Sequence, residues 1–465
     1  MSDLDRIRFG TDGWRDHRDA FTDRRVSAVG DAFVSYLIEA GTDDAPIAVG
    51  YDAREGADAI AEVLAERAIA AGFDVWLAER DCPTPAVAAA IDDFDLAGGF
   101  MVSASHNPPS YHGIKLIPHG GAPALPSVTD RVVDLLGAGV DPISETPGSI
   151  DPFDFIDFHI ETVLERIEPD LEGMTIAYDA MHGSGRGVTD AVLEAAGAEV
   201  DRLRCTQHPT FGGTPPEPTA TNLSELIERV TEGDADFGIA NDGDADRVAI
   251  VTDEDYLDPN LLFAVLYEHL LETDSGPAVR TVSTTYLIDR IAEAHGQSVH
   301  ETPVGFKWVA DAIGEFDALI GGEDSNGLTI RGHVREKDGV LVGTLAADVH
   351  ARHSFDARVA DLFDRYGPIY HTTENVDCPE AMKSSVLEAV EADSPDSFAG
   401  VSVSSVSAVD GLKFLLTDGS WVLVRPSGTE EKLRVYAESG DADRAVAIAE
   451  VAAAELAEQV STLHR

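Results

Sequence analysis

One pattern repeats along most of this sequence: a short apolar segment, a loop rich in Gly or Asp, and then an alanine-rich amphipathic segment. The apolar segments are Pro46–Gly50, Met174–Tyr178, Phe237–Ala240, Ala278–Val282 and Phe316–Ile320, and helices are predicted over Gly56–Ala71, Thr189–Ala196 and Tyr286–Ala294. Short strands that alternate with amphipathic helices are typical of parallel sheets built from right-handed crossovers. The pattern therefore predicts an α/β architecture for the larger part of the chain.

Shifts in composition mark the expected joints between domains. Gly137–Asp154 is rich in Gly, Pro and Asp, and further breaks fall near Asp253–Pro259 and Tyr366–Pro368. Beyond them the pattern becomes a helix, several strands and a final helix at Asp441–Gln459, which is typical of an α+β domain. A chain of 465 residues is long enough for several domains. We expect three similar α/β domains with mixed, mainly parallel sheets at residues 1–150, 151–254 and 255–366, and a smaller C-terminal α+β domain at residues 367–465.

The chain is extremely acidic, with a formal net charge of −52 from 85 acidic and 33 basic residues. The carboxylates are dispersed through segments that alternate apolar and polar residues, so they do not form a disordered acidic tail. Such a surface is tolerable in concentrated salt, where screening shortens to about 3 Å at 1 M. We therefore expect a folded protein from a halophile. The charge argues against binding to nucleic acid or to anionic membranes.

Three cysteines, Cys82, Cys205 and Cys378, are widely spaced and odd in number, which indicates neither a disulfide framework nor a zinc site. The N-terminal residues show no signal-peptide pattern, and no apolar run is long enough to span a membrane. These features favour a soluble protein of a reducing, cytoplasmic compartment.

The motif Val-Ser-Ala-Ser-His-Asn-Pro at residues 102–108 follows an apolar run from Leu96 to Val102. That run predicts a buried strand, so Ser105 is expected on a loop at its carboxyl end, where open α/β sheets hold their ligands. A loop that stops at a proline holds a side chain in one place, as a nucleophile or a phosphoryl carrier requires.

A second motif, Asn241-Asp-Gly-Asp-Ala-Asp-Arg247, lies between the apolar runs Phe237–Ala240 and Val248–Val251. Its three alternate carboxylates can converge on one hard cation, for which oxygen ligands favour Mg²⁺ or Ca²⁺. A calcium EF-hand is disfavoured, because Arg247 replaces the required glycine and a strand pattern follows. Arg247 beside three carboxylates indicates a metal site that also receives an anion.

Two further loops contain polar residues suited to a sugar phosphate. In Gly321–Gly327, Glu323 and Ser325 provide acceptors and a hydroxyl for sugar hydroxyls. Arg425-Pro-Ser-Gly-Thr429 follows the apolar run Trp421–Val424, and its arginine, hydroxyls and glycine are suited to a phosphate.

The chain has only six lysines: Lys115, Lys307, Lys337, Lys383, Lys413 and Lys432. Because the surface has almost dispensed with lysine, those that remain are good functional candidates. Lys383 is the exception, since it lies in an ordinary helix-like stretch.

Together these residues resemble the α-D-phosphohexomutase family, which includes phosphoglucomutase, phosphomannomutase and phosphoglucosamine mutase. The resemblance covers essentially the whole chain and rests on five motifs: Phe9–Arg15, Ser103–Pro108, Asp242–Arg247, Gly322–Ser325 and Arg425–Thr429. It implies four domains around a central cleft, and each domain would supply one loop to that cleft.

The resemblance implies a role for each motif. Ser105 would be the phosphorylated serine, and Asp242, Asp244 and Asp246 would hold Mg²⁺ together with Ser105. Lys337, Lys115 and His106 are the other catalytic candidates. The residues expected to bind substrate are Arg15, Arg247, Gly305, Glu323, Ser325, Arg425, Ser427, Gly428, Thr429 and Arg434.

The implied reaction transfers the phosphoryl group of Ser105 to the free hydroxyl of a hexose 1- or 6-phosphate. A hexose 1,6-bisphosphate forms as intermediate and activator, turns over, and returns its other phosphate to Ser105. The implied partner is therefore a small hexose phosphate, and we expect a monomer or a small homo-oligomer.

Departures from the family pattern bear on the sugar. Mannose- and glucosamine-type members usually have a histidine where this chain has Gly327. His333–Gly339 instead resembles phosphoglucomutases, which makes Lys337 the expected acid/base group and glucose the expected sugar. Asp16, His112 and Glu431 also depart from the usual residues. Mannose or glucosamine specificity, a metal-dependent sugar phosphatase and a catalytically silent sugar-phosphate sensor are the alternatives.

Overall fold

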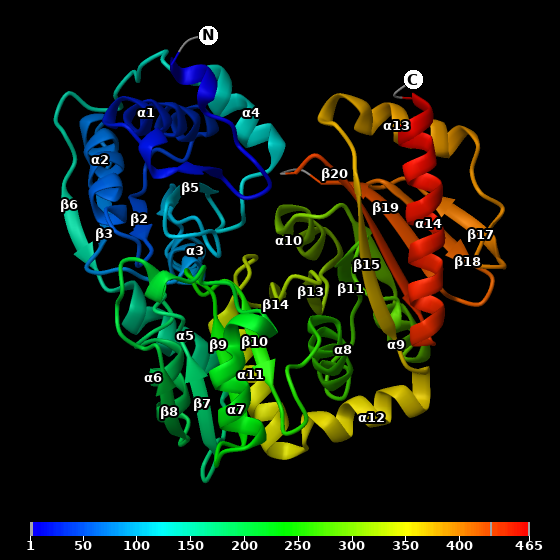
Figure 1. Ribbon diagram of the computed structural model, residues 1–465. Helices are drawn as coiled ribbons and strands as arrows, with labels where there is room; N and C mark the ends of the chain where they lie inside the picture. Colours follow the sequence, from blue (N-terminus) through cyan, green and yellow to red (C-terminus); the bar gives the residue numbers. More distant parts are fainter. Residues whose placement is uncertain (1–2, 428–429, 464–465) are drawn as a thin grey trace. The chain divides into compact units, whose positions relative to one another are not determined.

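The structure is a computed structural model that describes residues 3–427 and 430–463 (Figure 1). The chain forms two compact units. The first contains the chain up to Ala278 together with Gly305–Asp356, and the second contains Val279–Val304 together with the chain from Ala357 onward. Within the described residues, no helix is both long and apolar enough to cross a membrane.

The first unit begins with a six-stranded sheet in the order β1-β5-β4-β2-β3-β6. Its strands are β1 (Trp14–His17), β2 (Ile47–Tyr51), β3 (Val75–Ala78), β4 (Gly98–Val102), β5 (Tyr111–Pro118) and β6 (Ile150–Phe153). The four strands β4, β2, β3 and β6 are parallel, as the alternating pattern predicts, whereas β5 and β1 pair antiparallel at one edge. The helices of this part are α1 (Asp23–Ala40), α2 (Ala57–Ala70), α3 (Thr84–Asp93) and α4 (Pro126–Leu135).

A second sheet in the same unit has the order β10-β9-β7-β8. Its strands are β7 (Thr175–Asp179), β8 (Glu199–Leu203), β9 (Phe237–Asn241) and β10 (Val248–Val251), and its helices are α5 (Phe155–Ile167), α6 (Thr189–Ala195) and α7 (Ser224–Thr231). Strands β9, β7 and β8 are parallel, and β10 returns antiparallel to β9. The tight return between β9 and β10 presents the three-aspartate motif.

The rest of the first unit contains α8 (Pro259–Leu270), α10 (Phe306–Phe316), β13 (Ile320–Gly322), β14 (Leu328–Ile330) and α11 (Gly339–Arg352). Strands β13 and β14 form an antiparallel hairpin whose turn holds the predicted sugar loop. Helix α11 packs against β9 and β10, and Asp338 caps its first turn by accepting from the amides of Val340 and Leu341. This cap fixes the backbone immediately after Lys337.

The second unit contains α9 (Leu287–Ala294) and β12 (Val299–Thr302). It also contains most of β11 (Ala278–Thr281) and α12 (Phe355–Tyr366), whose first residues belong to the first unit. It also holds an antiparallel sheet in the order β15-β20-β19-β18-β17-β16. The bounds are β15 (Tyr370–Asp377), α13 (Lys383–Ala392), β16 (Ser397–Phe398), β17 (Val401–Ser407), β18 (Leu412–Leu416), β19 (Trp421–Pro426), β20 (Lys432–Ser439) and α14 (Ala442–Leu463). This is the predicted α+β arrangement.

Two expected element boundaries are wrong. Phe316 was expected to open a strand, but it ends α10, because Asp317 takes a left-handed φ of 48° and the strand begins only at Ile320. Arg425 and Pro426 were expected in a loop, but they extend β19, where Arg425 pairs with Arg434 on β20.

Candidate active site

Ser105 lies just beyond the carboxyl end of β4, as the apolar run before it predicts. Its side chain is buried, and its backbone adopts a φ of 51°, which few residues other than glycine tolerate. The Ser105 hydroxyl donates to Asp242 Oδ2 at 2.7 Å and lies 3.2 Å from His106 Nδ1. The serine of one motif therefore contacts a carboxylate of another that is 137 residues away.

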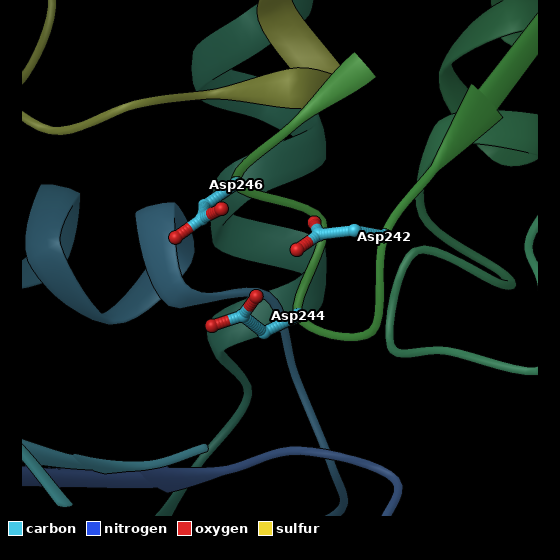
Figure 2. A group of neighbouring side chains, drawn as sticks. All are labelled: Asp242, Asp244 and Asp246. Carbon is cyan, nitrogen blue, oxygen red and sulfur yellow. The ribbon is translucent and has the colours of Figure 1, made fainter. Parts of the chain in front are cut away.

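The three aspartates of the second motif converge (Figure 2). Asp242, Asp244 and Asp246 are fully buried, and each offers a carboxylate oxygen within 4.8 Å of the others. Burial, reinforced by the Asp246 and Asp244 carboxylates, raises the pKa of Asp242 well above its usual value. Burial acts in the same direction on Asp244, but Lys115 and the Thr84 hydroxyl overcome it and hold the pKa of Asp244 below its usual value.

The donor set fits a divalent cation. Among the described residues, Asp244 Oδ1 and Asp246 Oδ1 are buried without a hydrogen-bond partner, so acceptor oxygens remain available for a cation. Ser105 Oγ adds a fourth oxygen next to Asp242. Oxygen ligands of this kind suit Mg²⁺, which is usually bound by a few carboxylates together with a phosphate.

Two buried lysines face the aspartates. Lys115 on β5 has its Nζ at 2.7 Å from Asp246, 2.9 Å from Asp244 and 3.1 Å from Asp12. Lys337 Nζ lies 3.3 Å from Asp246 and 3.2 Å from Glu336. Burial opposes the charged form of both lysines, but the surrounding carboxylates prevail and raise the pKa of each above its usual value. Both predicted proton-transfer candidates thus lie beside the predicted metal ligands.

Gly327 is adjacent to Lys337. A Cβ atom on Gly327 would lie 2.4 Å from Lys337 Cδ and 3.0 Å from its Cγ. The stem of Lys337 therefore occupies the space that any side chain at position 327 would need. Gly327 and Lys337, the two residues that favoured glucose, are therefore packed together, and the lysine depends on the absence of a side chain at position 327.

The predicted sugar loop lies in the turn between β13 and β14. Glu323 is buried and accepts from the amide of Gly305 at 2.9 Å. Burial raises the pKa of Glu323, opposed by Lys337 and Arg247. Ser325 is half-buried on the same turn, and the carbonyl of Asn326 accepts from the amide of Val248 on β10. The sugar loop is therefore tied to the strand that follows the aspartates.

Three further predicted residues surround Ser105. Arg15 on β1 donates to Asp12 at 2.6 Å and to Asn107 at 3.4 Å. The amide of Arg247 donates to Asp242 at 3.1 Å. The charge of Arg247, together with burial and Arg15, lowers the pKa of His106 to about 2, which keeps this imidazole neutral.

The predicted phosphate loop belongs to the second unit. Arg425 lies opposite Arg434 on neighbouring strands, with Asp410 at 2.7 Å from the first and Glu430 at 3.0 Å from the second. Like charges that face each other across a strand pair are unfavourable without counter-charges. Ser427 is buried at the end of β19, whereas Gly428 and Thr429 lie outside the described residues.

Sequence reasoning missed several contributors. Lys383, regarded as an ordinary helical residue, is buried and donates to the carbonyls of Ser427 at 2.6 Å and Glu430 at 2.8 Å. The Thr84 hydroxyl, on α3, donates to Asp244 at 2.6 Å. Asp12, within the Phe9–Arg15 motif, had no predicted role, but its carboxylate lies 3.1 Å from Lys115 Nζ. The scarcity of lysine was the one signal that pointed to Lys383.

Models of the four domains of phosphoglucomutase/phosphomannomutase match nearly the whole chain. Domain I matches residues 6–139, domain II residues 154–255, domain III residues 258–366 and the C-terminal domain residues 374–455. The fold and site thus define an isomerase of the phosphohexomutase class, built from three α/β domains and a C-terminal α+β domain. The chain belongs to the phosphoglucomutase/phosphomannomutase family.

Relatives from archaea cover the same length. The chain is 32% identical over 443 residues to a probable phosphoglucosamine mutase of Methanopyrus kandleri, covering 94% of this chain and 95% of the relative. It is 29% identical over 449 residues to a phosphoglucomutase/phosphomannomutase of Thermococcus kodakarensis, with coverage of 94% and 95%. Among solved structures, a putative phosphomannomutase from Thermus thermophilus matches with a TM-score of 0.83 at 28% identity, covering 97% of this chain and 99% of that one. The names of these relatives span three sugar specificities.

Proposed function

We propose that this protein is a phosphoglucomutase that interconverts glucose 1-phosphate and glucose 6-phosphate through phosphorylated Ser105. The observation that carries the proposal is the position of the Ser105 hydroxyl, 2.7 Å from Asp242 in a buried group of three aspartates faced by Lys115 and Lys337. A phosphoryl group in transfer needs positive charge around its oxygens, which the two lysines and a metal ion held by the aspartates would supply.

The residues divide the work as follows. Asp242, Asp244, Asp246 and Ser105 Oγ would hold Mg²⁺, whose charge neutralises that of the phosphoryl oxygens. The bond from phosphorus to Ser105 Oγ breaks as a bond to the free sugar hydroxyl forms. The sugar hydroxyl gives its proton to the neutral form of a lysine, for which Lys337 is the proposed group and Lys115 the second candidate, and Ser105 Oγ takes up a proton as it leaves the phosphorus. The hexose 1,6-bisphosphate then turns over and returns its other phosphate to Ser105.

The remaining candidates bind the substrate. Glu323 and Ser325 are proposed to bind sugar hydroxyls, and Arg15, Arg247 and Gly305 to line the same site. His106, neutral beside Ser105, completes the proposed catalytic group. In the second unit, the segment Arg425–Thr429 with Arg434 is proposed to bind the phosphate that is not transferred.

Glucose specificity rests on the contact between Gly327 and Lys337. Because the lysine stem fills the space at position 327, the site has a lysine where a histidine at 327 would otherwise stand. A second candidate, glucosamine specificity, is favoured by the names of several relatives, among them a 32% identical one. We further propose a cytoplasmic enzyme adapted to concentrated salt, with domain boundaries near residues 150, 254 and 366.

The test is an assay in concentrated salt that compares kcat/KM for the 1-phosphates of glucose, mannose and glucosamine. The proposal predicts the highest kcat/KM for glucose 1-phosphate, with the 6-phosphate as product. A preference for glucosamine 1-phosphate would replace the specificity but keep the reaction class. Net release of inorganic phosphate without an isomer would instead indicate a metal-dependent phosphatase.

A further inference from the structure

Arg54 lies in the short connection between β2 and α2. Strands β2 and β4 are parallel neighbours, with Tyr51 opposite Val102, so the segments that follow them run side by side at one edge of the sheet. One segment carries Asp52 and Arg54, and the other carries Ser105. The side chains of Arg54 and Asp52 are completely buried, with Nε of the arginine 2.9 Å from the Asp52 carboxylate.

The Arg54 guanidinium uses its remaining donors on the backbone around Ser105. Its Nη2 donates to the carbonyls of Ser105 at 2.6 Å and Asn107 at 2.8 Å. Its Nη1 donates to the carbonyls of Pro108 at 2.7 Å and Tyr111 at 3.2 Å. A guanidinium has five N–H donors in a fixed fork, so this one side chain satisfies every donor while holding three carbonyls of the Ser105 loop and that of Tyr111, the first residue of β5.

The amide side of the same loop is held as well. Ser103 Oγ accepts from the amide of Ser105 at 2.8 Å and donates to Asp52 at 2.8 Å. Asp52 therefore holds both Arg54 and Ser103, and the peptide groups on either side of Ser105 are fixed from one ion pair. This matters because Ser105 has a φ of 51°, a conformation that persists only where the surroundings impose it.

We propose that Arg54 is a positioning residue that holds Ser105 in this conformation and so directs its hydroxyl toward Asp242. The inference rests on the proposed function, in which Ser105 carries the phosphoryl group. Arg54 is buried beneath the loop, its guanidinium 5.0 Å from the centroid of the Phe211 ring, and it acts through the backbone. A lysine at this position keeps the charge but has three donors on one atom, so it cannot hold four separated carbonyls and Asp52.

The test compares Arg54→Lys with a matched control, Arg280→Lys. Arg280 is similarly buried, and its guanidinium donates to Asp289 and Glu301, which both belong, like Arg280, to the second unit. Dephosphorylated enzyme is mixed with glucose 1,6-bisphosphate, and the gain of about 80 Da is followed by intact mass. We expect Arg54→Lys to slow phosphorylation and kcat by about 10²-fold, as a misplacement of about 1 Å does, with KM changed by less than about threefold.

A second readout separates positioning from general destabilisation. Free guanidinium at low millimolar concentration should restore part of the kcat of Arg54→Ala and none of that of Arg280→Ala. Wild-type phosphorylation rate and kcat in Arg54→Lys, or the same loss in Arg280→Lys, would overturn the inference. If Arg54→Lys does not fold, Ser103→Ala decides: slowed phosphorylation supports the inference, and the wild-type rate contradicts it. Failure of wild-type enzyme to take up a phosphoryl group would instead overturn the proposed function.

Discussion

The contact between Gly327 and Lys337 allows the role of the lysine to be tested without altering the lysine. In Gly327→Ala, the new Cβ would lie 2.4 Å from Lys337 Cδ, whereas ordinary contact begins at about 3.4 Å. The lysine stem must therefore move by about 1 Å. A shift of that size in a catalytic group costs about 10²-fold in kcat, or about 2.7 kcal/mol in the barrier.

The effect on stability is expected to be smaller. Overpacking a buried site costs about 1–3 kcal/mol, and replacing glycine by alanine returns about 0.4–1 kcal/mol by restricting the unfolded chain. A matched control is Gly343→Ala on α11, where the new methyl would meet Ile239 at 3.1 Å and Val248 at 3.3 Å, away from the lysines. These contacts are milder than the one at Gly327, and alanine is favoured over glycine within a helix by about 1 kcal/mol, so this control should keep its stability to within about 1 kcal/mol and keep its kcat.

The assay follows formation of the hexose 6-phosphate from the preferred hexose 1-phosphate in concentrated salt, with thermal unfolding measured alongside. Gly327→Ala should also be tested in the Lys337→Met background. If the alanine acts through the lysine, it costs little more once the lysine is gone, and the two effects are strongly non-additive. Wild-type kcat in Gly327→Ala, or a full additional loss in the double variant, would refute the reasoning.

Three other predictions follow from the charges. Chelation of divalent cations should abolish turnover reversibly, and Asp246→Asn should raise the Mg²⁺ concentration for half-maximal activity by at least about tenfold; full activity in chelator would contradict the metal site. Burial and Arg280 lower the pKa of Lys413 to about 8 from 10.5, so the folded state loses this proton first. The stability of wild type relative to Lys413→Met should then rise by up to about 3 kcal/mol between those pH values, and a constant difference in chemical unfolding would contradict the shift. With a net charge of −52, the melting temperature should rise as KCl is raised toward about 1 M, and a salt-independent value would contradict the halophilic interpretation.

Several strands and helices of the α/β part, among them β2, β7, α2 and α9, were predictable because apolar periodicity is a local property of the sequence. The same holds for the metal loop, whose three aspartates alternate within five residues and lie between two apolar runs. Boundaries set by a single backbone conformation were not predictable, as the left-handed Asp317 that ends α10 illustrates.

Long-range partners left no local signal. Thr84 contacts Asp244 across 160 residues, and Arg54 reaches the carbonyl of Ser105 across 51. Edge strand β1 pairs antiparallel with β5, and edge strand β10 pairs antiparallel with β9, although the alternating pattern indicates parallel neighbours. Such pairings depend on which segments the chain brings together, and neither composition nor spacing carries that information.

The central claim is that Ser105 carries a phosphoryl group, and intact mass spectrometry tests it most directly. Enzyme treated with glucose 1,6-bisphosphate should show a species about 80 Da heavier, with the modification on Ser105. Ser105→Ala should show no such species and no turnover. An unmodified wild type, or a fully active Ser105→Ala enzyme, would contradict the account.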